Sequence, residues 1–209
     1  MITLKEMRDD VRARVNDDEG KLGTAHLTHI INIGQSVVYN QLLPIISIKL
    51  TATEKQNTVI GQSEYSLPSN CREVKRVKLN NKKATGKVIE EIDTVDTNTF
   101  ALATTDEPAY LEWNKKVEIH PTPTSVIIDG IRIDYLKQTI PLLTDMNISI
   151  KPEEYHGLIV DYVEGVVLRK LGRAQEAIIS ENTISKMFTD IQNANNQQLA
   201  ITELKKEKS

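Results

Sequence analysis

The spacing of apolar residues changes twice along this chain, and that change limits the folds that it can adopt. The first segment repeats apolar residues at helical spacing, at Leu4, Met7, Val11 and Val15. From Ile45 to Tyr135 apolar residues alternate with polar ones, which is typical of β strands with one wet face. Helical spacing returns after Pro152 and continues to Ile191. The chain therefore predicts an α+β protein, in which N- and C-terminal helices form a helical bundle and the centre forms an antiparallel β-sheet or small β-sandwich.

Local signals mark the ends of two N-terminal helices. Thr3 and Glu6 have the spacing of a capping box, which predicts a first helix over roughly residues 3–16. Thr24 favours the start of a second helix. We expect this helix to end before Pro44, because a proline disfavours helical backbone at the residue before it.

Two C-terminal helices are also expected. Pro152 and the two glutamates after it suit a first helical turn, where no N–H is needed and the helix dipole favours carboxylates. Gly172 predicts the end of that helix, and a last helix starts near Arg173. Beyond Ile191 the apolar stripe is lost in the segment NANNQQ and a charged end, so we expect fraying there unless a partner orders it.

The central segment contains several short runs with the period of a β strand. Turn-forming clusters separate them, and the pair Asp129-Gly130 predicts a bulge or tight turn inside the last run. The candidate strands are 45–50, 74–79, 99–103, 109–113, 117–120 and 126–135.

These patterns divide the chain into a helical pair at 1–44, a β-rich middle at 45–149, and C-terminal helices with a tail at 150–209. Each helical part has one apolar stripe that it cannot bury alone. We therefore expect both helical parts to pack together as one domain.

Composition narrows the functional classes. The 209 residues carry a formal net charge of −3, which argues against a dedicated nucleic-acid binder but not against a protein that surrounds DNA. The single cysteine excludes an intramolecular disulfide. The N-terminus lacks the apolar core of a signal peptide, and no apolar run has membrane-spanning length. We expect a soluble protein made in the cytoplasm, with no membrane partner.

No group of residues has the pattern of a catalytic, cofactor or metal site. His26 and His29 lie three residues apart on the second predicted helix, but a zinc site needs at least one more ligand, which only a carboxylate or the distant His120 or His156 could supply. The glycines do not form a phosphate-binding loop, and no nucleophile elbow occurs. We expect no enzymatic activity, no metal and no cofactor.

An ordered set of short motifs resembles the head-to-tail adaptor (connector, or neck ring) proteins of tailed bacteriophages, as in short-tailed phages. Each motif alone is weak, whereas their order and spacing are more specific. The motifs are Tyr65-Ser-Leu-Pro68 before a basic strand at Arg72–Val77, Glu112-Trp113, Ile119-His-Pro-Thr-Pro123, Tyr135 with Pro141-Leu-Leu, and Pro152-Glu-Glu-Tyr-His156.

The resemblance implies a structural virion protein of the neck, at the portal vertex. Such a protein forms a ring, dodecameric by analogy, that docks on the portal protein and extends the channel for genomic DNA without binding a particular sequence. It also provides an attachment platform for the tail or further neck proteins. Two alternatives remain: another neck or tail-completion ring protein, and a β-rich binding module for glycans or a host protein.

The resemblance also implies that the C-terminal segment reaches toward the portal. Its apolar residues have the spacing used when a helix binds in a groove. The candidate portal-binding strip consists of Ile184, Met187, Phe188 and Ile191. The alternative is that these side chains pack on the protein's own helices.

Charge is distributed unevenly in the β-rich middle. Seven basic residues and one acidic residue lie between Arg72 and Lys87, whereas six acidic residues and no basic residue lie between Glu90 and Glu107. Neighbouring subunits of a ring meet through two different patches, and opposite charges favour the correct pairing. The candidate inter-subunit patches are Arg72, Lys75, Arg76 and Lys78 on one side and Glu90, Glu91, Asp93 and Asp96 on the other. The alternative is a hairpin whose strands pair within one subunit.

Overall fold

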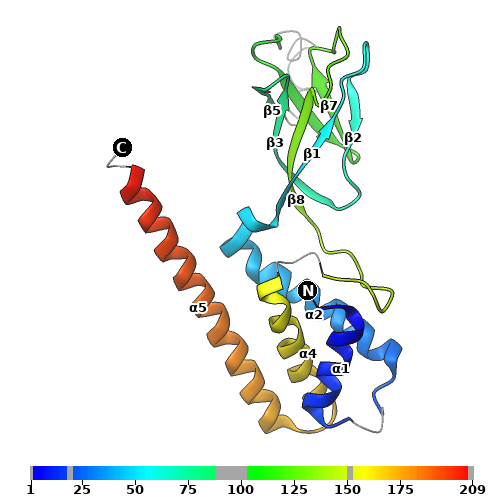
Figure 1. Ribbon diagram of the computed structural model, residues 1–209, viewed down its shortest axis with the longest axis vertical. Helices are drawn as coiled ribbons and strands as arrows, with labels where there is room; N and C mark the ends of the chain where they lie inside the picture. Colours follow the sequence, from blue (N-terminus) through cyan, green and yellow to red (C-terminus); the bar gives the residue numbers. More distant parts are fainter. Residues whose placement is uncertain (1, 18–20, 88–102, 150–152, 207–209) are drawn as a thin grey trace. The chain divides into compact units, whose positions relative to one another are not determined.

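A computed structural model describes residues 2–17, 21–87, 103–149 and 153–206. The chain forms two compact units (Figure 1). The helical unit comprises Met1–Leu50 and Thr139–Ser209, and the β unit comprises Thr51–Gln138. The β unit is thus an insertion in the helical unit, and the α+β class predicted from the sequence is confirmed.

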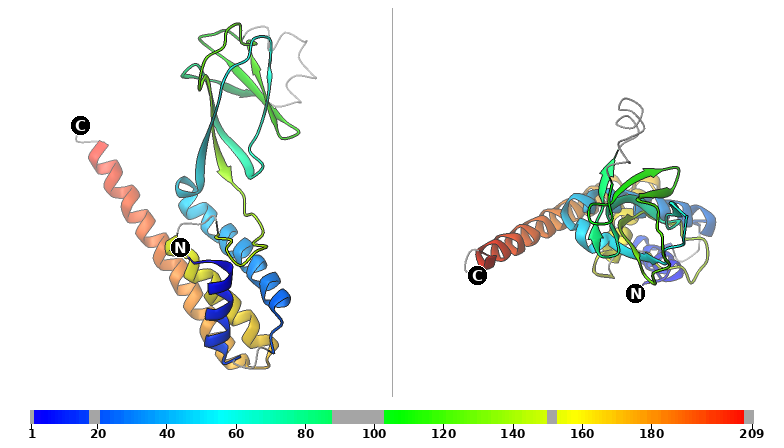
Figure 2. Two further views of the ribbon diagram at one scale, coloured as in Figure 1. Left: turned by 45° about the vertical axis from the view of Figure 1, so that its right-hand side comes forward. Right: turned by 90° about the horizontal axis from the view of Figure 1, so that it is seen from above.

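The helical unit contains four α-helices, counted over the described residues: α1 (Leu4–Val15), α2 (Thr24–Ile46), α4 (His156–Lys170) and α5 (Ala174–Lys206). Two short 3₁₀ turns, η1 (Ser47–Leu50) and η2 (Glu153–Tyr155), adjoin α2 and α4. Helix α4 contacts each of the other three helices (Figure 2). Its buried side chains include Leu158, Ile159, Val163 and Val167.

Helix α1 begins as its sequence predicts. The backbone N–H of Thr3 donates to Glu6 Oε2 at 2.7 Å, and the N–H of Glu6 donates to Thr3 Oγ1 at 3.3 Å. These two bonds complete the capping box and satisfy two backbone donors at the helix end. The predicted boundaries of this helix are confirmed within one residue.

A strap at residues 139–149 returns the chain to the helical unit and is held by amide side chains of α2. Asn32 donates through Nδ2 to the carbonyl of Leu142 at 3.0 Å and accepts from the N–H of Leu142 at 2.7 Å. Gln35 Nε2 donates to the carbonyl of Ile140 at 2.9 Å. The strap therefore has a defined path although it has no regular secondary structure.

The β unit contains two four-stranded sheets. In the first sheet, β1 (Thr51–Gln56), β8 (Ile131–Lys137), β3 (Cys71–Leu79) and β4 (Lys82–Lys83) are antiparallel neighbours in that order. The second sheet has the order β2 (Glu64–Ser66), β7 (Lys116–His120), β6 (Ala109–Trp113) and β5 (Thr85–Lys87), with β5 and β6 parallel.

Both sheets contribute to one apolar core, which makes the β unit a small β-sandwich. The first sheet supplies buried residues of β3 and β8, and the second supplies residues of β2 and β7. The cluster consists of Tyr65, Val74, Val77, Leu79, Ala84, Val117, Ile119, Ile131, Ile133 and Tyr135. Neither sheet would bury its apolar face without the other.

The predicted end of the second helix is wrong. Helix α2 contains Pro44 and ends at Ile46, and η1 follows before β1 begins at Thr51. The buried side chains of this stretch lie four residues apart, at Leu42, Ile46 and Leu50. This spacing places all three on the side that packs in the helical bundle. Four is a multiple of the strand period as well as close to one helical turn, which explains why 45–50 also resembled a strand.

Two further segments differ from the predicted elements. The strand predicted at 126–135 begins only at Ile131, because Thr58 Oγ1 accepts from the N–H of Ile127 at 2.7 Å and draws that segment out of the ladder. Asp129 then forms the expected turn, with φ of 54°. Helix α5 continues through the NANNQQ segment to Lys206, over the stretch where the sequence predicts fraying unless a partner orders it.

Other predicted strands are confirmed at 74–79, 109–113 and 117–120. The strand predicted at 99–103 lies outside the described residues except for Ala103, which is not in a strand. None of the described helices combines the length and apolarity needed to cross a bilayer.

Gly34 sets the distance between α2 and α4. A Cβ at this position would lie 2.9 Å from Val163 Cγ2 and 3.0 Å from Tyr162 Cδ1. Gly157 is a matched control in α4, because a Cβ there would have no neighbour within 4 Å.

We predict that Gly34→Ala destabilises the helical unit although alanine is the better helix former. The lost space costs about 1–3 kcal/mol, whereas the helix propensity gains about 1 kcal/mol. Gly157→Ala is expected to be neutral or stabilising by up to about 1 kcal/mol. Thermal unfolding followed by circular dichroism at a helical wavelength measures both effects. A rise in Tm for Gly34→Ala would contradict the close approach.

Candidate interaction surfaces

The predicted portal-binding strip lies on α5, within the part of that helix that runs beside α2 and α4. Ile184 is buried at 7% exposure, while Phe188 and Ile191 are half-buried. Met187 is exposed, at 36%. The structure therefore places Ile184 in the helical unit's own core and leaves Met187 the most accessible of the four.

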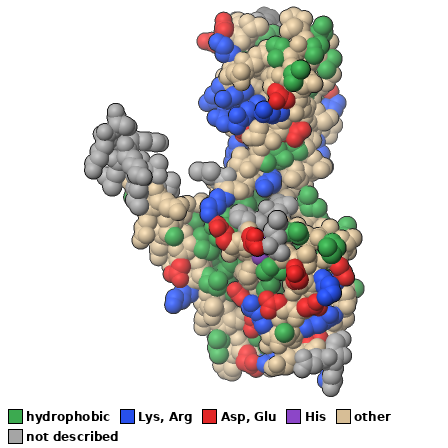
Figure 3. Space-filling view, in the orientation of Figure 1, with side chains coloured by type: hydrophobic (Ala, Val, Ile, Leu, Met, Phe, Trp, Pro, Cys, Tyr) green, Lys and Arg blue, Asp and Glu red, His purple; other side chains and the backbone are tan. Residues whose placement is uncertain are grey.

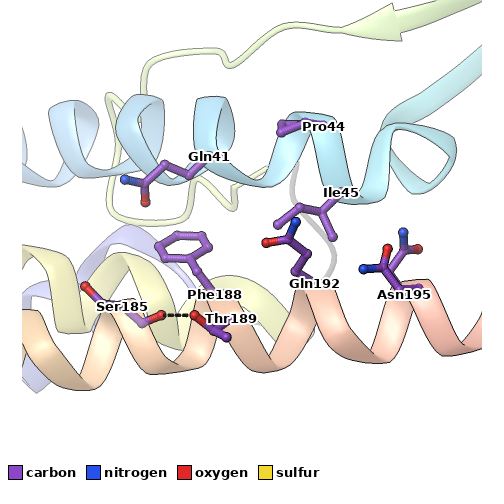
Figure 4. A pocket seen from close by; sticks show the side chains of 9 residues that line it. Gln41, Pro44, Ile45, Ser185, Phe188, Thr189, Gln192 and Asn195 are labelled. Carbon is purple, nitrogen blue, oxygen red and sulfur yellow. Dashed lines mark hydrogen bonds between the residues drawn. The ribbon is translucent and has the colours of Figure 1, made fainter.

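A groove of about 390 Å³ runs between α2 and α5. Figure 4 shows Phe188 pointing toward α2, beside Gln41. Pro44 and Ile45 of α2 supply further apolar surface, and amide side chains line much of the remainder. The lining residues are Gln41, Pro44, Ile45, Ser185, Phe188, Thr189, Gln192, Asn195 and Asn196. Apolar contact surface with a polar rim of donors and acceptors suits an extended or helical peptide segment.

A second hollow, of about 360 Å³, lies among α1, α4 and α5 and is organised by Arg14. Its guanidinium donates to Asp161 at 2.5 Å, to Asp10 at 2.9 Å and to Glu164 at 3.2 Å. Burial lowers the pKa of Arg14, but these hydrogen bonds outweigh it and hold the pKa above its usual range. Arg14 therefore stays charged and ties α1 to α4 rather than presenting a free cation.

His26 and Cys71, the residues considered for metal and thiol chemistry, belong to different units of the chain. His26 Nε2 is 3.1 Å from Lys170 Nζ at the surface of the helical unit. Over the described ranges no three histidine, cysteine or carboxylate side chains gather as metal ligands. Burial raises the pKa of the Cys71 thiol, at the start of β3. This thiol is consequently less reactive than a free cysteine.

Basic side chains gather on one part of the β unit surface (Figure 3). Of the four basic residues proposed for the subunit contact, two are paired within the chain: Lys75 with Glu73 at 2.6 Å and Arg76 with Asp134 at 2.7 Å. Arg72 and Lys78 lie on the same strand. The proposed acidic partners Glu90, Glu91, Asp93 and Asp96 lie outside the described residues.

Asp134 organises the charges of this surface. Its carboxylate accepts from Thr53 Oγ1 at 2.6 Å, from Arg76 Nε at 2.7 Å and from Arg132 Nε at 3.0 Å. Burial alone would raise the pKa of Asp134. The three hydrogen-bond donors lower the pKa by a larger amount, so that the net pKa is about 2. The carboxylate is thus ionised at any physiological pH, and we call these four residues the Asp134 centre.

Sequence reasoning missed Arg132 and Asp134. Both lie in the segment Ile131-Arg-Ile-Asp134, where two core isoleucines alternate with two charged residues. That alternation puts the two charges on one face of a strand and was a readable signal. Their partners on β1 and β3 depend on strand pairing, which the segment itself does not encode.

We predict that Asp134→Asn destabilises the β unit near neutral pH but not in acid. The native carboxyl has a pKa of about 2 against an ordinary value of 3.8, so its contribution is complete above pH 4 and disappears as the pH falls toward 2. That shift corresponds to about 2 kcal/mol. Urea unfolding followed by Trp113 fluorescence reports on the β unit, because Trp113 is the single tryptophan of the chain.

Asp129→Asn provides the control for this prediction. Asp129 is 3.0 Å from Lys55, but both side chains are about half exposed. Such a surface pair contributes less than about 1 kcal/mol. An equal loss of stability for Asp134→Asn at pH 6 and pH 2.5 would show that the carboxylate's charge is not what stabilises the centre.

The chain was also compared with known proteins and protein families. No curated protein matches this chain. A family model described as SU10 adaptor protein matches residues 2–204, which include both units and all the described helices almost completely. The chain therefore belongs to the SU10 adaptor protein family, the head-to-tail adaptor proteins of tailed bacteriophages, and is a structural component of the virion.

Proposed function

We propose that this adaptor assembles into a ring of twelve subunits that docks on the portal protein, extends the channel for genomic DNA and gives the tail its attachment platform. The family match over residues 2–204 supports an adaptor, and the groove between α2 and α5 is the observation that carries the docking proposal. The protein acts without catalysis in this role.

The groove offers a portal segment both apolar contact and hydrogen bonds. Phe188 and Ile45 supply apolar surface, while Gln192 and Asn195 supply amide groups. Met187 and Ile191 lie close by on α5 and are partly exposed. In this proposal Ile184 anchors α5 in the bundle, whereas Met187, Phe188 and Ile191 meet the portal.

The long polar end of α5 supports the same proposal. Helix α5 extends past the other helices of its unit (Figure 2) and continues to Lys206. The described side chains at 192–198 are polar or small and mostly exposed, and a helical segment of this kind has little to stabilise it beyond its own backbone hydrogen bonds. A protein partner that contacts this segment would add packing to it.

Ring closure requires a contact between two different surfaces of neighbouring subunits. We propose that Arg72 and Lys75, near the start of β3, take part in this contact with the acidic stretch of the next subunit.

Substitution of the exposed part of the strip tests portal docking. We predict that Met187→Asp combined with Ile191→Asp abolishes co-purification with the portal protein, because two carboxylates would be buried without partners in the contact. Asn182→Asp is the control, since Asn182 is exposed on a different side of α5. Circular dichroism verifies that the helices remain folded.

Two results of this experiment would contradict the docking proposal. One is unchanged co-purification of the double variant, and the other is equal loss with Asn182→Asp. Native mass spectrometry of the wild-type complex counts the adaptor subunits on each portal, and a number other than twelve would correct the proposed stoichiometry.

A further inference from the structure

Four basic residues form one line across the first sheet of the β unit. Lys55 on β1 lies opposite Arg132 on β8, Arg132 lies opposite Lys78 on β3, and Lys78 lies opposite Lys83 on β4. With strands about 4.8 Å apart, the line spans about 14 Å. We call these four residues the cationic row.

All four side chains belong to the outer face of the sheet. Ile131 and Ile133 are buried in the core, so Arg132 between them faces outward. The same holds for Lys78, which lies between buried Val77 and Leu79. Their directly opposed neighbours Lys55 and Lys83 share that face.

The row is costly for folding alone, because like charges that lie directly opposite on neighbouring strands destabilise a sheet. The available carboxylates offset only part of this repulsion. Lys55 pairs with Asp129 at 3.0 Å, and Arg132 with Asp134 at 3.0 Å. Within the described part of the chain, Lys78 and Lys83 have no ion pair. A ligand with several negative charges would remove the repulsion.

The Asp134 centre holds two guanidinium groups ready for such a ligand. Arg76 and Arg132 both donate through Nε to the one carboxylate. Their side chains remain 44% and 42% exposed. One carboxylate cannot neutralise two guanidinium groups, so a positive charge and several N–H donors stay available at fixed positions. The planar fork of arginine fits the oxygens of a phosphate.

The face lacks the features of a protein-binding surface. Interfaces between proteins have an apolar centre, often with aromatic residues. None of the exposed large apolar side chains of the β unit lies in β1, β8, β3 or β4, over the residues described. Leu136 belongs to the outer face but is only 1% exposed. Interfaces with DNA, in contrast, are polar and strongly positive.

The described strands of this sheet expose no aromatic ring, which favours double-stranded over single-stranded DNA as the ligand. Proteins that bind single strands stack the bases on aromatic side chains. In the described strands of this sheet the aromatic residue is Tyr135, which is buried in the core at 6% exposure. The phosphate backbone of a duplex needs no stacking partner.

We propose that the cationic row, with Arg76, binds the phosphate backbone of double-stranded DNA without reading its sequence. The inference rests on the proposed function for its setting, where DNA passes through the adaptor, and it names the side chains that meet the DNA. About four phosphate contacts give a salt dependence of log K near −3 to −4. Affinity is accordingly modest and falls steeply with salt.

Fluorescence anisotropy of the purified protein with a labelled mixed-sequence duplex tests this at several salt concentrations. We predict that Lys78→Gln with Lys83→Gln weakens binding on the order of tenfold at low salt and makes the salt slope shallower by about two units. The control, Lys5→Gln with Lys186→Gln, removes the same charge from exposed positions of the helical unit and leaves both values unchanged. Trp113 fluorescence verifies that the β unit is folded.

Several outcomes would overturn the inference. They are no binding of the wild-type protein to duplex at low salt, equal effects of the two double variants, and preference for a single strand of equal charge. Displacement of the duplex by polyglutamate at equal charge would assign the face to an acidic protein surface instead. The two proposals can fail separately. If Lys78→Gln with Lys83→Gln loses DNA binding but still co-purifies with the portal protein, the loss belongs to the cationic row and not to portal docking. The docking proposal fails if Met187→Asp with Ile191→Asp still co-purifies with the portal protein.

Discussion

The packing of α4 against α1, α2 and α5 is the interaction on which the rest of this structure depends. Helices α1 and α2 precede the β unit in sequence, whereas α4 and α5 follow it. Val163 of α4 is fully buried and lies against the site of Gly34 in α2. Burial of each such side chain contributes about 1.5–3 kcal/mol, so the two halves of the helical unit have a strong reason to meet. Their meeting brings together, within the helical unit, the two chain segments that lead into and out of the β unit.

Much of this fold was predictable because the period of apolar residues reports directly on the buried face. The capping box at Thr3 and the stop at Gly172 were local signals that needed no tertiary information. The period is ambiguous at Leu42, Ile46 and Leu50. Their spacing fits a helix and a strand alike, and packing against the bundle favours the helix. Pro44 predicted the end of the helix. The free energy gained by burying these apolar side chains is larger than the loss of the one backbone hydrogen bond that a proline removes, so the helix continues.

The candidate surfaces were less predictable, because they combine residues that strand pairing brings together. Arg132 and Asp134 share a face through simple alternation, but their contact with Thr53 and Arg76 depends on the register of two antiparallel pairs. A slip of one residue would turn every side chain of a strand to the other face. On α5 the difficulty is different. A helical apolar stripe looks the same whether it packs inward or binds a partner, and only the structure separates buried Ile184 from exposed Met187.

The charges of the β unit suit contact with a polymer that has to move. The whole chain has a net charge of −3, so its average field repels DNA, and the binding inferred above would depend on a local basic face. Because the Asp134 carboxylate has a pKa of about 2, the arginines beside it keep the same arrangement throughout the physiological pH range. A small number of phosphate contacts gives binding that is easily broken at cellular salt, whereas a uniformly basic surface would release many more counterions and hold the DNA in place. In the proposed role, a short cationic row on a protein of negative net charge would therefore reconcile attraction to DNA with its free passage.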